Sequence, residues 1–543
     1  MPRNRVREAS TQRRDMLSAL DTVAERYRCD LATIRATPAG VRRLLSSAKA
    51  AELGVRPKRL ANVQSCVRKA LELYGNPTTP ITKRIPLTAE WSALLDLISN
   101  EQHRYGLYRL ATYASAMGLA PSAIDGEALL GFHAALENED AVKDPRKRLK
   151  QTIALWNMCQ RGVPGWPQTV LRSPFKVDPE ALPLTAFPPS FQQDVAAWTE
   201  WVTHPDIFNP TAPRKPFRPA TVEQRVYDFR RFASAVVSRG DLKLDEVTSI
   251  SVLFDTTRFK SGLRYFLQRA GNKPTAHLAL KAKKLLAVAK SYCRVDAAVL
   301  TELTQMCRRL DDEIGPQQLS VRNRERLRQF DDQEKVAKLL NFPQEERARG
   351  RHLRNPLRAA RCMERALAIE ILLVCWLRIQ NLRTIHLVNN LRVIGKKVFL
   401  TFEGHEVKNG RMLDFELPPE LAQALAEFRA TYRPRLPGAS GPYLFPGKDS
   451  GARSTSALRN GIEETLRKNA GLVMNPHLFR HALAKIVVEK DPALYPVVSR
   501  HLGHSRLSMT MAHYLGTETR AAGRHLDRLL HEVAADVVKS RKK

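Results

Sequence analysis

The sequence predicts a mostly helical protein with tandem helical modules, followed by a mixed α/β domain that contains a small antiparallel sheet. Apolar residues recur at helical spacing over most of the chain. Residues 398–402 and 412–417 read as short strands, and they flank Lys408-Asn409-Gly410, in which Asn-Gly is a strong hairpin signal. A chain of 543 residues, 43% of them apolar, is long enough for several domains.

The N-terminal part reads as two helical modules. The first spans residues 1–80, with its clearest helical spacing at 31–45 and 60–73. A cluster of prolines at 77–80 then interrupts the pattern. The second module spans residues 81–163, and its helical segments are 91–99, 106–117, 127–135 and 147–159.

A proline-rich stretch separates these modules from the rest. Residues 164–219 hold twelve of the 33 prolines and one helical segment, so we expect a linker of restrained flexibility there. A third helical domain follows at 220–310, and the mixed domain occupies 320–543 together with a helical tail.

A short repeat links the second and third helical domains. Tyr113-Ala-Ser-Ala116 precedes Gly118, and Phe232-Ala-Ser-Ala235 precedes Gly240. Both domains also close with a basic amphipathic helix, at 147–156 and 277–290. Two copies of one DNA-facing module explain this pattern, and a shared helical composition is the alternative. The first segment, with its basic helix at 59–71, matches less well.

The charge balance indicates a polyanionic partner. Lysine and arginine number 88 against 55 acidic residues, which gives a formal charge of +33 and favours nucleic acid. The longest apolar stretch, 366–377, contains Glu370 and is too short to span a membrane. The basic N-terminus runs into no apolar signal region, so we expect the protein to stay in the cytoplasm, associated with the nucleoid.

The cysteines indicate neither a disulfide framework nor a metal site. All seven are scattered along the chain, and no two form a CxxC pair. The sequence also lacks a GxxxxGK[ST] phosphate-binding loop. We therefore expect reduced thiols and no cofactor or metal.

Several motifs occur in one order in the C-terminal domain. They are Val374-Cys-Trp-Leu-Arg378, Lys408 beside the predicted turn, Asn475-Pro-His477-Leu-Phe-Arg480, His501-Leu-Gly-His504 and Tyr514. In this order they resemble the tyrosine recombinase (phage integrase) family, which has an arginine, a lysine on a hairpin, a His-x-x-Arg box, a Leu-Gly-His box and a nucleophilic tyrosine. The helical domain at 220–310 is similar to the core-binding domain of the family.

The resemblance implies strand cleavage by phosphoryl transfer. Two guanidiniums, Arg378 and Arg480, are suited to the non-bridging phosphate oxygens because they stay protonated and bind in bidentate fashion. A phenol has a pKa of about 10, so Tyr514 needs help to attack, and His477 is the expected helper. The product implied is a 3′-phosphotyrosyl enzyme, formed without ATP or metal.

The resemblance assigns two further residues to the site. Lys408 is expected to protonate the leaving 5′ oxygen, and His504 to donate a hydrogen bond to the phosphate. Lys396 and Lys397 are alternatives for the lysine, on the strand-like run before the hairpin. Lys408 is preferred because it precedes the Asn-Gly turn.

The sequence departs from the family pattern in three places. Cys375-Trp376 stands where a Thr-Gly pair is common, and Asn381 stands where an acidic residue is usual. The gap from His504 to Tyr514 is ten residues, one longer than the commonest spacing, and places His513 at the expected position. We keep Tyr514 because histidine is a poor substitute for the nucleophile.

The tail beyond Tyr514 carries a stripe of leucine and valine side chains at helical spacing. The stripe either packs on its own domain or docks on a neighbouring protomer, and the resemblance favours docking in a homo-tetramer on DNA. The expected partners are double-stranded attachment sites, with related recombinases or DNA-bending proteins as further candidates.

The function predicted is therefore that of a site-specific DNA recombinase that integrates or excises a mobile element. One alternative is a type IB topoisomerase or telomere resolvase, which uses similar tyrosine chemistry for another purpose. The other is a non-catalytic, architectural DNA-binding subunit that has kept the fold.

Overall fold

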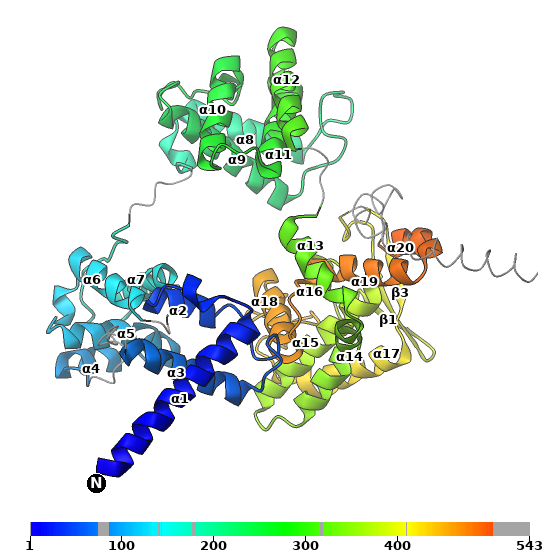
Figure 1. Cartoon of the computed structure of the whole chain (residues 1–543). Coiled ribbons are helices and arrows are strands. Elements are labelled where there is room, and N and C mark those ends of the chain that lie inside the picture. Colours follow the sequence, from blue (N-terminus) through cyan, green and yellow to red (C-terminus); the bar gives the residue numbers. More distant parts are fainter. Residues whose placement is uncertain are drawn as a thin grey trace, which may run out of the picture. The chain divides into compact units, whose positions relative to one another are not determined.

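The computed structural model of the chain describes residues 2–73, 86–139, 142, 144–175, 181–314, 319–408 and 410–502 (Figure 1). Most of these residues are helical, and three strands form one antiparallel sheet, which confirms the predicted fold class. The chain divides into two compact units. One joins residues 1–174 with 319–543, and the other is formed by 175–318. No helix in the described ranges is long and apolar enough to cross a membrane.

The first helices pack around a small apolar cluster. They are α1 (Pro2–Tyr27), α2 (Pro38–Leu45) and α3 (Pro57–Leu73), which bury Val23, Leu45 and Val67. The helical pattern predicted over 31–45 is interrupted, because Thr37 caps α2 and accepts a hydrogen bond from the Gly40 amide. The proline at position 38 is therefore the first residue of a new helix.

The second module contains four helices. They are α4 (Ala89–Asp96), α5 (Glu101–Ala116), α6 (Gly126–Glu137) and α7 (Pro145–Gly162). Trp91 and Trp156 meet in its core with ring centroids 6.3 Å apart, and Trp166 packs on Trp156 at 5.2 Å. The start of the predicted linker therefore belongs to this module.

The unit formed by 175–318 includes the rest of the predicted linker. Its helices are α8 (Pro189–Thr203), α9 (Pro219–Ser238), α10 (Thr256–Arg269), α11 (Ala276–Val288) and α12 (Ala297–Ile314). Trp198 of α8 packs edge-on against Phe229 of α9 at 4.9 Å. The one helical segment expected in the proline-rich stretch is α8. Two of the twelve prolines begin α8 and α9, and aromatic residues of the stretch enter the core of this unit.

The same kind of helix contact occurs within the second module and within the 175–318 unit. Tyr113 of α5 lies against Gly131 of α6, where an added Cβ would be 2.3 Å from the phenol oxygen. Phe232 of α9 lies against Gly262 of α10, where an added Cβ would be 2.6 Å from the ring. In each pair, glycine allows the helix to approach the aromatic residue closely.

The serine of the Ala-Ser-Ala run accepts a hydrogen bond from a backbone amide at both of its occurrences. Ser115 accepts a hydrogen bond from the Thr88 amide at 3.1 Å, and Ser234 accepts one from the Leu182 amide at 2.9 Å. A Pro-Leu-Thr-Ala run lies near both donors, at 86–89 and 183–186, a repeat that our sequence analysis missed. These matched contacts favour duplication of one module over a shared composition.

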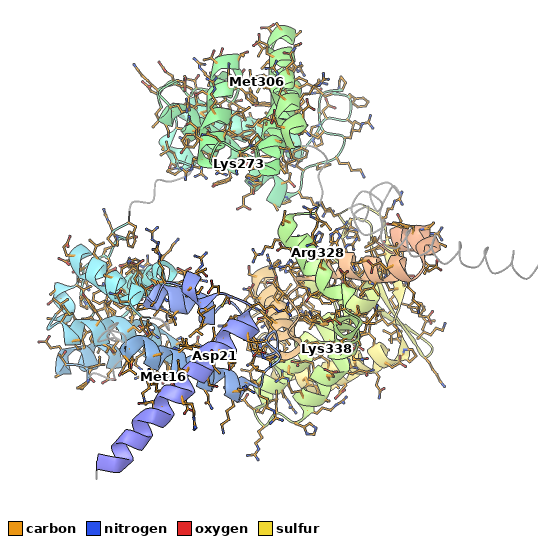
Figure 2. The ribbon with its side chains drawn as sticks, viewed as in Figure 1. Met16, Asp21, Lys273, Met306, Arg328 and Lys338 are labelled. Atoms are coloured by element: carbon orange, nitrogen blue, oxygen red, sulfur yellow. The ribbon has the colours of Figure 1, made fainter. Side chains whose placement is uncertain are left out.

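The C-terminal domain surrounds a long, mostly buried helix, α15 (Pro356–Cys375). Arg328 and Lys338, labelled in Figure 2, lie on the two helices before it, α13 (Val321–Arg328) and α14 (Gln333–Arg351). The elements after it are α16 (Ile379–Arg383), β1 (Leu391–Ile394), β2 (Lys397–Phe402), β3 (Leu413–Glu416), α17 (Pro419–Glu427), α18 (Thr455–Thr465), α19 (Pro476–Lys490) and α20 (Tyr495–His501).

The sheet has the order β1-β2-β3, and both pairs are antiparallel. The predicted hairpin is therefore present. A ten-residue connection, 403–412, joins Phe402 to Leu413, close to the bounds of the two predicted strands. Val407 is fully buried, so this connection folds back onto the domain. Asn409 lies outside the described residues.

Candidate active site

Arg378 lies at a break between two helices. Trp376 ends α15 with a left-handed backbone (φ 47°), and Arg378 is the extended residue that caps α16. The left-handed backbone of Trp376 ends the first helix, which is why Arg378 lies between the two helices and not within one of them. Arg378 is half-buried, and burial lowers the pKa of its guanidinium.

Arg480 is buried on α19 and connects three parts of the site. Asn475 caps this helix by accepting a hydrogen bond from the Leu478 amide at 3.1 Å. Arg480 is 6% exposed, and its guanidinium donates to the backbone carbonyls of Trp376 and Leu502. The second contact is 2.7 Å long. One side chain therefore holds the segment before Arg378 and the start of the Leu-Gly-His box.

His477 lies on the first turn of α19, three residues before Arg480, and its side chain is exposed. Its ring lies 5.0 Å from that of His481, nearly perpendicular to it, and their Nε2 atoms are 3.4 Å apart. His481 is buried and was given no role from sequence. Because the residues are three apart, His477 and Arg480 share one face of the helix.

The connection that carries Lys408 is anchored to α16 and to the end of the sheet. Asn381 donates from Nδ2 to the Glu406 carbonyl at 3.3 Å. Asn390 donates to the Glu406 carboxylate at 3.1 Å, and the same carboxylate accepts from the Glu403 amide at 2.8 Å. Lys408 follows this anchored turn and is exposed.

The structure distinguishes Lys408 from the alternative Lys397. Lys397 begins β2 and forms an ion pair with Glu416 of β3 at 2.8 Å. Asn381 stands where the family has an acidic residue, and its amide makes a contact that a carboxylate cannot make, because a carboxylate has no N–H. The departure at Asn381 thus has a structural role in holding the lysine connection.

His501 is a residue of the site that our sequence analysis did not identify. It ends α20, and its Nε2 lies 3.0 Å from the Val374 carbonyl. Its ring packs edge-on against Trp376 at 4.7 Å and against Phe415 of β3 at 5.4 Å. Burial lowers its pKa, and the charge of Arg480 adds to this effect. Its place in the motif, three residues before His504, was the only signal in the sequence.

A small apolar cluster holds α20 against α19. It contains Trp376, Leu483, Val488, Val498 and Leu502. This packing positions the chain up to Leu502. His504, Tyr514, the alternative His513 and the tail with its apolar stripe lie outside the described residues. In the described part of the chain, no group of three or more His, Cys, Asp or Glu side chains is arranged to hold a metal ion.

The C-terminal domain matches a known family. Residues 332–520 match the phage integrase family. Two solved structures are similar to parts of the chain, both of the XerH site-specific recombinase. The post-cleavage complex with palindromic difH substrate has 13% identity and a TM-score of 0.28, and covers 50% of this chain and 84% of that chain. The pre-cleavage complex with difH has 12% identity and a TM-score of 0.30, and covers 60% and 92%. A comparison with curated proteins finds no match.

Proposed function

We propose, from the membership of residues 332–520 in the phage integrase (tyrosine recombinase) family, that this protein is a site-specific DNA recombinase acting through Tyr514. The observation that carries the proposal is the position of Arg480. A buried guanidinium that joins the Arg378 segment to the start of the Leu-Gly-His box brings three motifs of the family to one place.

The arginines supply the electrostatic part of the mechanism. Attack on a phosphodiester concentrates negative charge on the non-bridging oxygens, and preorganised guanidiniums stabilise that charge. A guanidinium carries five N–H donors, which lets one side chain hold backbone carbonyls and a phosphate oxygen together. Arg480 is fixed by its carbonyl contacts, and Arg378 stays charged although burial lowers its pKa, because the ordinary pKa of an arginine lies far above neutral pH.

Proton transfer falls to two other residues, His477 and Lys408. His477 is exposed on the same helix face as Arg480 and accepts the proton of the Tyr514 phenol. Lys408, on its anchored connection, protonates the leaving 5′ oxygen. His504 donates a hydrogen bond to the phosphate. The P–O bond to the 5′ oxygen breaks as the bond to the tyrosine oxygen forms. The 3′ phosphate of the cleaved strand therefore stays covalently bound to the protein.

The decisive experiment is trapping of the covalent intermediate. The full chain is incubated with a nicked duplex that carries the sequence flanking its gene, and products are separated on a denaturing gel and mapped by mass spectrometry. We expect a DNA adduct on Tyr514 that is absent in Tyr514→Phe and still present in His513→Phe. Tight binding without any adduct favours the architectural subunit, and an adduct on another residue overturns the assignment of the nucleophile.

We also propose that the second module and the 175–318 unit both hold duplex DNA. The matched glycine and serine contacts support one duplicated module, and each copy contains a basic helix, α7 or α11, although α12 follows α11 in the 175–318 unit. Contacts to many phosphates make affinity fall steeply with salt. Deleting residues 1–174 should lower the slope of log affinity against log salt, and an unchanged slope contradicts a DNA contact there.

Two further proposals concern the biological role of the enzyme and its oligomeric state. We propose integration or excision of a mobile element, by a homo-tetramer linked through the tail after Tyr514. Recombination between two attachment sites tests the first, and the mass of the protein–DNA complex tests the second. Relaxation of supercoiled plasmid without such sites points instead to a topoisomerase, and hairpin-ended products to a telomere resolvase.

A further inference from the structure

The 175–318 unit contains a cavity of about 510 Å³, apart from the active site. It lies among α8, α9, the segment before α9 and the C-terminal part of α11, which share one core (Figure 1). Cavities that hold small ligands commonly have about 300–1,000 Å³. The volume therefore suits an organic molecule rather than a single ion.

Aromatic side chains form much of the wall. Trp198, Trp201 and Phe217 all line the cavity. Trp198 is fixed, because it packs edge-on against Phe229 at 4.9 Å and against Phe217 at 6.4 Å. Trp201 is held by Tyr292 at 5.4 Å. Indole and phenyl faces of this kind favour a planar, aromatic ligand.

The charge of the lining is entirely positive. Four basic residues line the cavity, and none of the described residues that line it is acidic; the four are Arg214, Lys215, Arg225 and Lys284. Arg225 is half-buried, and burial lowers the pKa of its guanidinium, while nearby Asp228 acts in the opposite direction. Asp228 is itself paired with Lys281 at 3.6 Å. The cavity therefore favours a ligand with an anionic group.

Two donors in the lining are buried without an acceptor. Trp198 is 1% exposed, and its indole Nε1 has no hydrogen-bond partner among the described residues. The same holds for Nη1 of Arg225. Buried donors are almost always hydrogen-bonded in folded proteins. Both atoms have almost no accessible surface in the empty cavity, so an acceptor on a bound ligand reaches them only when the lining side chains adjust.

We propose that this cavity binds one nucleotide. A base supplies the planar ring for Trp201 and Phe217, together with an acceptor atom for Trp198 Nε1. A phosphate supplies the anion for Arg225 and Lys284. The nucleotide comes either from solution or from an unpaired position of bound DNA, and both sources present the same chemistry. This proposal does not depend on the recombinase activity of the C-terminal domain.

The test is a binding titration of the full chain by calorimetry and tryptophan fluorescence. The probes are the four 5′-mononucleotides, thymidine, inorganic phosphate and a ten-residue oligothymidylate. We expect one site per chain for a mononucleotide or for the oligonucleotide, and much weaker binding of thymidine and phosphate. Trp198→Phe, which keeps the ring and removes the donor, should weaken binding about 3- to 10-fold. Arg225→Gln should weaken it at least as much.

Matched variants control for the general basicity of the chain. Lys290→Ala removes an exposed charge from the helical turn that follows α11, outside the lining of the cavity. Trp166→Phe removes a second buried indole donor without a partner in the described chain, in the other unit. Both should leave the affinity unchanged. Circular dichroism of each variant verifies that it is folded.

Each outcome decides the proposal. A mononucleotide whose affinity falls in Trp198→Phe and Arg225→Gln identifies a free nucleotide, and the same losses for the oligonucleotide alone identify an unpaired DNA base. Photocrosslinking with 5-iodouridine monophosphate gives a readout on the unaltered protein, with adducts expected on Trp201 or Phe217. Adducts elsewhere, or binding that Lys290→Ala weakens equally, overturn the proposal, and so does the absence of binding. A failed Tyr514 adduct leaves all of these readouts untouched.

Discussion

Arg480 and Trp376 are 104 residues apart in the sequence, yet the guanidinium of the first donates a hydrogen bond to the backbone carbonyl of the second. Trp376 has a left-handed backbone and precedes Arg378 by two residues. Arg480 also donates to the backbone carbonyl of Leu502, which is the first residue of the Leu-Gly-His box. A single side chain thus holds two segments of the candidate site, and this suggests a direct test.

Replacing Arg480 with lysine should affect both stability and chemistry. A single ammonium lacks the planar fork that holds two carbonyls, and a buried carbonyl without a donor costs about 1–3 kcal/mol. We expect a comparable fall in the free energy of unfolding, faster hydrogen exchange at 374–378, and no adduct. Arg354→Lys, at an exposed position, is the control. Unchanged exchange in Arg480→Lys contradicts the role given to these contacts.

Restoring the acidic residue at position 381 should harm this protein. In Asn381→Asp, a carboxylate replaces the amide that donates to the Glu406 carbonyl, so two acceptors face each other in a buried place. We expect faster hydrogen exchange over 403–408 and slower adduct formation. Asn389→Asp, in an exposed turn nearby, should change neither rate. If the adduct forms faster in Asn381→Asp, then Asn381 is a weaker replacement for the acidic residue that is usual in the family, and it does not act as an anchor.

Substitution can show whether Lys408 or Lys397 is the general acid. Removing a general acid typically slows a reaction about 10²- to 10⁴-fold, so Lys408→Ala should slow cleavage by such a factor. Lys397→Ala removes a strand ion pair with Glu416 and should leave the rate nearly unchanged. A substrate with sulfur in place of the leaving 5′ oxygen needs no proton and should rescue Lys408→Ala. Rescue of Lys397→Ala instead assigns the acid to the strand.

His501 should make the stability of the domain depend on pH. Its pKa in the folded protein lies below the usual 6.5, because burial disfavours the charged ring. The unfolded chain therefore binds a proton more readily, so stability is constant above pH 6.5 and falls as the pH drops below it. In His501→Gln this part of the slope should disappear in urea titrations at pH 5 to 7.5. His352→Gln, at an exposed position, should retain the slope seen in the unaltered chain.

Local patterns in the sequence were enough for the elements and for the family. Helical spacing predicted most of the helices, and residues 332–520 match the family that the order of the motifs indicated. The repeated Ala-Ser-Ala run pointed to two related modules, a proposal that the matched serine and glycine contacts support. These signals act over a few residues, which is why they are readable in the chain alone.

Other features were invisible at that level. The proline-rich segment was expected to be a linker with one helix, and nothing in the sequence indicated that its aromatic residues enter a core, because a proline restricts local backbone angles and carries no information on what the next side chains bury. The Asn-Gly pair indicated the hairpin, but not that burial of Val407 and the Asn381 contact anchor its connection. Contacts between residues far apart in the sequence leave no local pattern.

The sequence by itself indicated the family and, through it, the phosphoryl transfer that we propose, because the residue types and their order suit that reaction. Only the tertiary structure decided which contacts hold the candidate residues in place. Arg480 reaches Trp376 and Leu502, and His501 reaches Val374, because helices distant in the chain pack into one core. Long-range packing also created the aromatic, positively charged cavity of the 175–318 unit, whose lining residues lie on separate helices and form no motif.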